Sequence, residues 1–144
     1  MAADVRGTYN TKVNSPTPEN IVDAIAVGGN VKMHYDEYEA ASLASGQKIA
    51  VGGNLPVGAR MVGGYIVHDA LKTGVTLKCG DAGDDNRYLV AAAAATAGTL
   101  ELRAIAGMGY EITGTDDTEV LIEVGGAAAT GTIKIVQFYV PQCS

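Results

Sequence analysis

The residues with the clearest potential for chemistry are the carboxylates of the segment DAGDDN, residues 81–86. Three carboxylates and one amide within six residues offer the oxygen ligands that Ca²⁺ prefers. The segment lacks the ligand spacing of an EF-hand and its bidentate Glu, so a calcium site at Asp81, Asp84 and Asp85 is a weak match. The alternative is a solvated loop whose Asp and Asn side chains accept hydrogen bonds from nearby backbone N–H groups. The sequence favours the loop.

The two histidines, His34 and His68, are each followed within two residues by an Asp. A His beside a carboxylate can act as a general base. However, no Ser or Cys lies in the context of a nucleophile elbow. A metal enzyme of the cupin kind would need several histidines and a carboxylate around the metal. We therefore expect both histidines on surface strands, and we predict a protein that is not an enzyme, with no catalytic residue, cofactor or metal.

The tyrosines and cysteines leave two questions open. Seven tyrosines are spread over several segments, so they favour protein interfaces over a single sugar-stacking face, which remains the alternative. Cys79 and Cys143 form no CxxC pair and have no His close in sequence. A disulfide between them stays open, but buried free thiols are favoured because each lies in or beside an apolar segment.

The composition argues against two classes of partner. The net charge is −6 and the ten basic residues are scattered singly, whereas nucleic-acid binding needs Lys and Arg massed on one face. No run approaches the roughly 18 apolar residues of a membrane helix, and the first ten residues lack the apolar stretch of a secretory signal. We expect neither nucleic acid nor membrane as a partner.

Period-two alternation of apolar and polar residues predicts β-strands in the segments 31–40, 75–79, 99–105, 119–124 and 132–140. In the first, Val31, Met33 and Tyr35 alternate with polar residues, and we expect these three on the core side. The last becomes apolar on both faces after Ile135. Gly-rich turns separate the segments, which predicts an all-β fold, an antiparallel sandwich or barrel.

Two segments do not fit this rhythm. The Ala-rich run 91–97 has high helix propensity but is short, and its small side chains equally suit a thin strand where two sheets or two subunits approach closely. Residues 1–30 are polar, contain Pro16 and Pro18, and close with Gly28-Gly29-Asn30. Within them, residues 19–27 could form one or two helical turns. Alternatively, and preferably, the whole stretch is an extended arm that folds against a partner.

Three parts of the chain carry a family resemblance: residues 55–71, residues 75–89 and the closing segments at Gly109-Tyr110 and 124–134. The second contains the pattern Gly-Asp-x-x-Asp-x-x-Arg-Tyr, here Gly80, Asp81, Asp84, Arg87 and Tyr88. Together they resemble small structural proteins of tailed bacteriophages, of the capsid decoration (cement) type. The resemblance covers about residues 45–140 and leaves the arm unmatched. Because its motifs are turn and strand residues, it implies a shared fold more securely than a shared role.

The residues and the resemblance together predict a jelly-roll-like antiparallel β-sandwich over residues 31–144, preceded by an arm over residues 1–30. We expect a decoration protein, made in the host cytoplasm, that binds the outer surface of the assembled major capsid shell as a homotrimer. The expected assembly contacts of the arm are Val5, Ile21, Val22 and Ile25. The alternative is a head-fibre or tail appendage that binds host-surface glycans.

Overall fold

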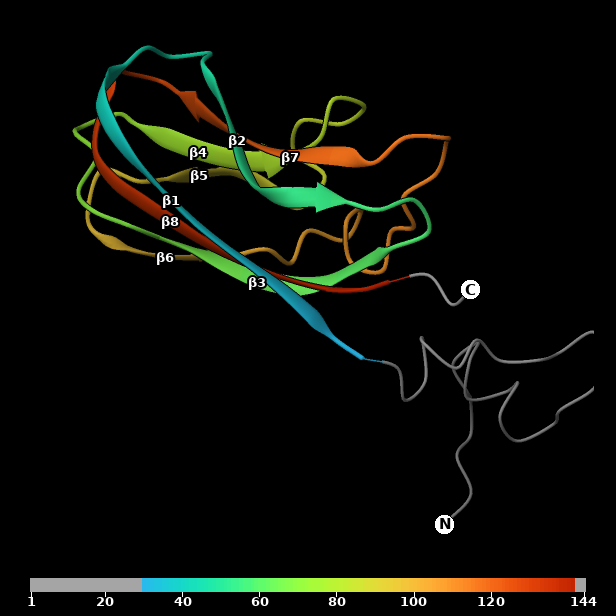
Figure 1. Cartoon of the computed structure of the whole chain (residues 1–144). Helices are drawn as coiled ribbons and strands as arrows, with labels where there is room; N and C mark the ends of the chain where they lie inside the picture. The colour runs from blue at the N-terminus through green and yellow to red at the C-terminus, as the bar shows by residue number, and fades with distance from the viewer. Residues whose placement is uncertain (1–29, 142–144) are drawn as a thin grey trace, which may run out of the picture.

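The computed structural model describes residues 30–141 of the chain. Within that range the protein is all-β and has no helix, and Figure 1 shows its strands in two layers. The eight strands are β1 (Lys32–Leu43), β2 (Lys48–Leu55), β3 (Arg60–His68), β4 (Thr76–Gly80), β5 (Leu89–Ala93), β6 (Gly98–Glu101), β7 (Thr118–Gly125) and β8 (Ala129–Val140). Over these residues, accordingly, no helix is long and apolar enough to span a membrane.

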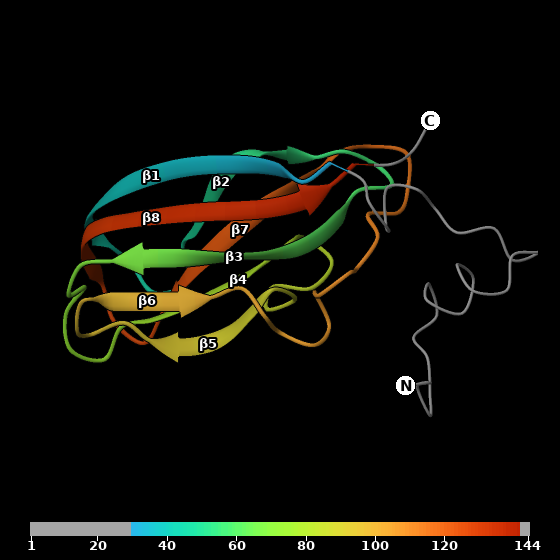
Figure 2. The ribbon, with the colours of Figure 1, turned by 90° about the horizontal axis from the view of Figure 1, so that it is seen from below.

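The strands pair as nested hairpins, as if the chain were folded in half between β4 and β5. β4 pairs with β5, β3 with β6, β2 with β7 and β1 with β8, all antiparallel. Further pairs join β8 to β3 and β7 to β4, which gives sheet A the order β1-β8-β3-β6 and sheet B the order β2-β7-β4-β5. Figure 2 looks onto sheet A with its strands in that order. This is the strand order of an eight-stranded jelly roll, so the predicted fold class is confirmed.

The core lies between the inner faces of the two sheets and is aliphatic. Sheet B contributes alternate residues of β4 and β7, as the period-two pattern of those segments predicts. Sheet A contributes alternate residues of β3 and β8. Almost fully buried core residues of these four strands are Met61, Ile66, Leu77, Val120, Ile122, Val124, Ile133 and Ile135.

The apolar residues of β1 lie on the opposite face from the one predicted. Val31, Met33 and Tyr35 are exposed, while His34 turns toward the sandwich interior and is half-buried. The pairing register explains this, because Tyr35 lies opposite Val136 on β8 and residues opposite each other share a face of the sheet. The neighbours of Val136 on β8 fill the core, so Tyr35 must point outward with it.

Two other expectations are settled by the strands near the middle of the chain. The predicted strand 99–105 ends already at Glu101, and the following turn leaves Ile105 98% exposed. The Ala-rich run begins in β5, so its first part adopts the strand alternative and not the helix. The predicted arm, residues 1–30, lies outside the described residues except for Asn30.

Candidate assembly interface

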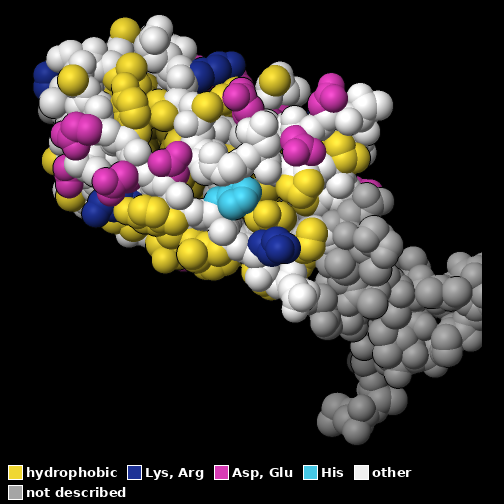
Figure 3. All heavy atoms as spheres, viewed as in Figure 1, with side chains coloured by type: hydrophobic (Ala, Val, Ile, Leu, Met, Phe, Trp, Pro, Cys, Tyr) yellow, Lys and Arg dark blue, Asp and Glu magenta, His cyan; other side chains and the backbone are white. Residues whose placement is uncertain are grey.

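Sheet A carries apolar side chains on its outer face as well as on its inner one. We define the apolar patch as the outward side chains of β1, β8 and β3 and the residue preceding β1: Val31, Met33, Tyr35, Val62, Tyr65, Val136 and Phe138. The most exposed, Met33, keeps 59% of its surface accessible. Figure 3 shows hydrophobic side chains along the lower edge of the molecule, where Figure 1 places sheet A. Contiguous apolar surface of this kind marks a site of association.

The strand register makes the patch continuous. Phe138 of β8 lies between Met33 of β1 and Gly63 of β3, and Val136 lies between Tyr35 and Tyr65. The rings of Tyr65 and Phe138 are 6.5 Å apart in a tilted arrangement, which is a favourable geometry for aromatic pairs. The patch is therefore a packed surface and not a set of isolated exposed residues.

The patch occupies one end of the outer face, and the other end is mixed, with the exposed Val67 of β3 beside polar residues. Farther along the same strands, Glu37 lies opposite Lys134, and the hydroxyl of Thr132 donates a hydrogen bond to Glu39. The apolar end is the one where β1 begins and β8 ends, since Lys32 pairs with Tyr139. The chain that precedes β1 thus joins the domain at the patch.

Behind the patch, the inner side of β1 and β8 holds an unusual polar cluster. The Gln137 side chain is fully buried, and neither its amide nitrogen nor its oxygen has a hydrogen-bond partner among the described residues. His34 Nε2 lies 3.3 Å from the Tyr139 hydroxyl, while its buried Nδ1 has no partner within the same part of the chain. Gly53 of β2 packs against the His34 ring so closely that a Cβ would lie 2.9 Å from it. The cluster forms where β2 crosses β1, at the bulge in β2.

The prediction of surface positions is therefore wrong for both histidines. His34 is half-buried against Tyr139, with ring centroids 4.8 Å apart. His68, at the end of β3, is 5% exposed and donates from Nδ1 to the backbone carbonyl of Asp69 at 2.8 Å. Both rings pack within the fold, because His34 and His68 occupy positions of β1 and β3 whose side chains face the core.

The acidic segment 81–86 is held together by its own hydrogen bonds. The buried Asp81 carboxylate accepts backbone N–H bonds from Gly83 and Asp84, both at 3.0 Å, and pairs with the Arg87 guanidinium at 2.8 Å. This bond to Asp81 raises the pKa of Arg87, whose guanidinium also stacks 3.8 Å from the centre of the Tyr110 ring. A Cβ on Gly80 would collide with the Asp84 carbonyl oxygen. The residues of the Gly-Asp-x-x-Asp-x-x-Arg-Tyr pattern thus stabilise the conformation of this loop.

Asp81, Asp84 and Asp85 do not converge on a common point as calcium ligands would. Asp81 binds Arg87, Asp84 accepts from the backbone N–H of Asn86, and Asp85 binds Lys78 on β4. Across residues 30–141, moreover, no three His, Cys, Asp or Glu side chains form a group that could hold a metal ion. The arrangement matches the loop interpretation of this segment.

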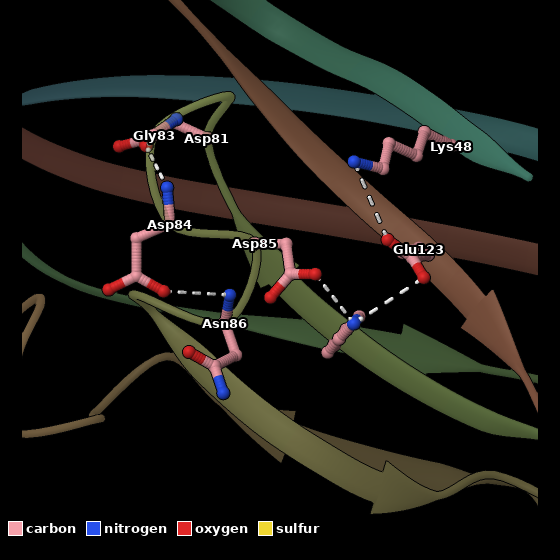
Figure 4. A network of polar contacts seen from close by, with 8 residues as sticks. Lys48, Asp81, Gly83, Asp84, Asp85, Asn86 and Glu123 are labelled. Carbon is pink, nitrogen blue, oxygen red and sulfur yellow. Dashed lines mark hydrogen bonds and ion pairs between the residues drawn. The ribbon is translucent and has the colours of Figure 1, made fainter. Parts of the chain in front are cut away.

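The outer face of sheet B differs from that of sheet A in carrying a row of ion pairs (Figure 4). Glu123 of β7 lies between Lys48 of β2, at 3.7 Å, and Lys78 of β4, at 3.4 Å. Lys78 extends the row to Asp85, at 2.8 Å, and its hydrogen bond lowers the pKa of that carboxyl. We call these four residues the ion-pair row. A face built this way is suited to water.

Cys79 lies on the inner face of β4 as a fully buried free thiol, as predicted. Burial, together with the nearby Asp81 carboxylate, raises the pKa of this thiol to about 12. Its predicted counterpart Cys143 lies outside the described residues, as do the proposed arm contacts Val5, Ile21, Val22 and Ile25.

A groove opens along the other side of the sandwich, between the edge strands β5 and β6 and the turn after β6. Its volume is about 880 Å³. Leu89, Val90, Ala92 and Leu100 line it from the strands, and Ile105 lines it from the turn. Of the described residues, two charged ones line its margin, Glu101 and Arg103, and they form an ion pair with each other at 2.8 Å.

The comparison with solved structures identifies the class of protein. Over 78% of its length, the chain matches a chain of the capsid asymmetric unit of cyanophage Pam1, covering 85% of that chain with 31% sequence identity and a TM-score of 0.66. The chain belongs to a family of bacteriophage capsid proteins. A chain of the capsid of Ralstonia phage GP4 shares the fold, with a TM-score of 0.64 and 23% identity over 81% of this chain and 87% of that one. No family model and no curated protein matches the chain.

Membership of a capsid protein family makes the protein a structural component of the virion, and the predicted resemblance to phage structural proteins is confirmed. Sequence reasoning missed the apolar patch, because it assigned Val31, Met33 and Tyr35 to the core. The signal was present in β8, where Val136 and Phe138 continue an apolar run on the face away from Ile135. A strand that is apolar on both faces requires a partner on each.

Proposed function

We propose that the protein is a capsid decoration protein that binds the assembled major capsid shell and stabilises it. The apolar patch carries this proposal. The sandwich already has a core between its sheets, and the residues of the patch lie outside that core. In a capsid protein the natural occupant of such a surface is another capsid component, and the shell is the component that a decoration protein covers.

Burial of the patch would supply the binding energy. Each large apolar side chain that passes from exposed to buried contributes roughly 1.5–3 kcal/mol, although ordering and desolvation costs leave only part of this as affinity. A protein that binds only the assembled shell stabilises it by mass action. The gain is roughly 3–4 kcal/mol per site when free protein is at several hundred times Kd. Repetition over a symmetric lattice would let modest contacts resist internal pressure.

We further propose that residues 1–30 act as a docking arm and that the protein works as a homotrimer on the outer capsid surface. The arm would be anchored by its apolar residues Val5, Ile21, Val22 and Ile25. Its point of attachment supports this role, because β1 begins beside the apolar patch. Arm and patch would then form one continuous binding surface. Deletion of residues 1–30 should abolish shell binding and leave a folded domain, and undiminished binding by the truncated protein would refute the role of the arm.

The test is co-sedimentation of the full-length protein with empty shells of the major capsid protein, after its mass in solution has been measured. The variant Met33→Glu/Val62→Glu places two charges on the patch, at positions that are 59% and 39% exposed and so tolerate substitution. We expect a loss of shell affinity of at least 100-fold. The matched control is Ala50→Glu/Ala93→Glu, which adds the same charge to exposed positions on sheet B. Equal binding by both variants would overturn the assignment of the patch.

The second candidate function is a head-fibre or tail appendage that binds host-surface glycans. Tyr35 and Tyr65 favour it, since both rings lie exposed on the patch and aromatic rings can stack on sugars. A glycan array and a calcium titration distinguish the two. Binding of a defined glycan that the Tyr65→Ala variant loses, with no sedimentation on shells, would support the appendage.

A further inference from the structure

The groove between β5 and β6 is the open side of the jelly roll. Among residues 30–141, β5 pairs only with β4 and β6 only with β3, so within this part of the chain each strand has one unpaired edge. Figure 2 shows these two strands side by side at one margin of the molecule, with β1 at the opposite margin of sheet A. Such edges are available for pairing with another chain unless something covers them.

The lining of the groove indicates an apolar peptide as its occupant. Val90 is 58% exposed and Ile105 is 98% exposed, although both are large aliphatic side chains. Glu101 and Arg103 are already paired with each other, and Asn86 and Thr99 are the remaining polar lining residues. The groove thus lacks the convergent polar groups that fix a sugar or cofactor. An extended apolar segment fits both the side chains and the free strand edges.

The chain itself contains a segment of this kind. Residues 19–27, with the sequence ENIVDAIAV, are the most apolar part of the first thirty residues. They end at Val27, and only residues 28–31 separate them from the start of β1. In the extended form the same segment would present apolar side chains on both sides, as a strand covered by the groove requires.

The length of this connection decides which copy of the groove the segment can reach. Fully extended, the chain from Val27 to Lys32 spans at most about 17 Å. Crossing sheet A from β1 to β6 takes three strand spacings, about 14 Å. The groove lies beyond β6, between layers about 10 Å apart. A chain's own segment would have to run taut across its apolar patch and still fall short, whereas a neighbouring copy can place the start of its β1 within this distance of the groove.

We propose that residues 19–27 of one copy occupy the groove between β5 and β6 of a second copy, so that copies are linked by exchanged arms. This inference rests on the proposed role of residues 1–30 as a docking arm, and it names the arm's receptor. If each copy gives its arm to the next copy around a rotation axis, the contacts close into a ring, as the expected homotrimer requires. It also covers the exposed edges of β5 and β6 and the side chain of Ile105.

The test is disulfide cross-linking between two full-length chains in the absence of shells, both with Cys143→Ser. One chain carries Ile25→Cys and the other carries Ile105→Cys, an exposed position where substitution leaves the fold intact. Cys79 is buried and does not compete. We expect a covalent dimer of the two different chains, at least tenfold more abundant than when Ala50→Cys on sheet B replaces Ile105→Cys. Equal yields would overturn the proposal, as would a cross-link formed only within one chain that carries both cysteines.

A second measurement uses the mass of the protein in solution. Val90→Glu/Ile105→Glu should reduce the assembly to monomers, as should deletion of residues 1–30, while Ala50→Glu/Ala93→Glu should leave it intact. An unchanged mass in the groove variant would contradict the exchange. The two proposals fail separately: cross-linked protein that ignores shells would refute shell binding alone, and protein that sediments with shells without the specific cross-link would refute the exchange alone.

Discussion

The two sheets of the jelly roll have the same strand number and similar inner faces, but their outer faces differ. Sheet B carries the ion-pair row, in which Glu123 lies between two lysines from the neighbouring strands. Sheet A carries the apolar patch, in which the rings of Phe138 and Tyr65 lie 6.5 Å apart. The fold does not require this difference, because either outer face could be polar.

The difference between the two outer faces separates residues whose contacts lie within the domain from residues that are left for contact with a partner. Charged residues on sheet B satisfy one another and need no further contact. Apolar residues on sheet A are satisfied only when something covers them. In a protein of a capsid family, this asymmetry fits the proposed function, in which sheet B faces solvent and the apolar patch faces the assembly. The following predictions test that division.

The largest expected effect distinguishes the two sides of one strand. Ile135 and Val136 are adjacent on β8, but Ile135 is buried in the core while Val136 belongs to the patch. We expect Ile135→Ala to lower the free energy of unfolding by about 3 kcal/mol, as truncation of a buried aliphatic side chain does. Val136→Ala should lower it by less than about 1 kcal/mol in the free protein, because half-burial leaves less to lose. Urea denaturation measures both, and similar losses would show that the patch belongs to the folding core.

The next largest effect is a pH-dependent change in the free energy of unfolding, caused by the buried thiol of Cys79 on the inner face of sheet B. Its pKa rises from 9.0 to about 12 in the folded protein, so the folded state favours the protonated form. Stability from this group is complete below pH 9 and is lost as the pH rises toward 12. At pH 10.5 the loss is about 2 kcal/mol by proton linkage. Unfolding free energies at pH 8 and 10.5 should show this loss in the wild type and a smaller one in Cys79→Ala. An equal loss in both proteins would place the alkaline sensitivity in other groups.

A smaller gain is expected from the inner face of sheet A, where Gln137 interrupts the aliphatic core. Its amide is buried and has no hydrogen-bond partner among residues 30–141, and a buried unpaired polar group costs about 1–3 kcal/mol. Gln137→Met has a similar shape and removes both unpaired atoms, so we expect it to raise the free energy of unfolding by about 1 kcal/mol. A rise in the thermal midpoint with unchanged shell binding would show that the polar cluster neither stabilises the fold nor takes part in shell binding. A fall would show that Gln137 has partners in solution.

The sequence predicted the jelly-roll class because β4, β7 and β8 alternate clearly and bury one apolar face each. It misassigned β1, because alternation identifies two faces but not which of them is inside. That choice depends on the pairing register with β8, where Tyr35 meets Val136. The groove could not be predicted from the sequence either, because it forms only where β5 and β6 are edge strands, and the order of strands in the sheets decides this. The acidic loop was predictable because the bonds of Asp81 to the backbone and to Arg87 are local.

The smallest effect is expected on the outer face of sheet B, where Asp85 ends the ion-pair row. Lys78 lowers the pKa of Asp85 by its hydrogen bond and charge, so the pair favours the folded state above the unfolded pKa of this carboxyl. That contribution is lost as the pH falls through the lowered folded value. Asp85 is exposed and Lys78 is only half-buried, so salt screens the pair, and ion pairs at the surface contribute little. Asp85→Asn should therefore shift the urea midpoint less than any substitution above, and 0.5 M salt should remove the shift. A larger loss would mean that the ion-pair row holds sheet B together, and the contrast between a solvent face and an assembly face would then rest on the apolar patch alone.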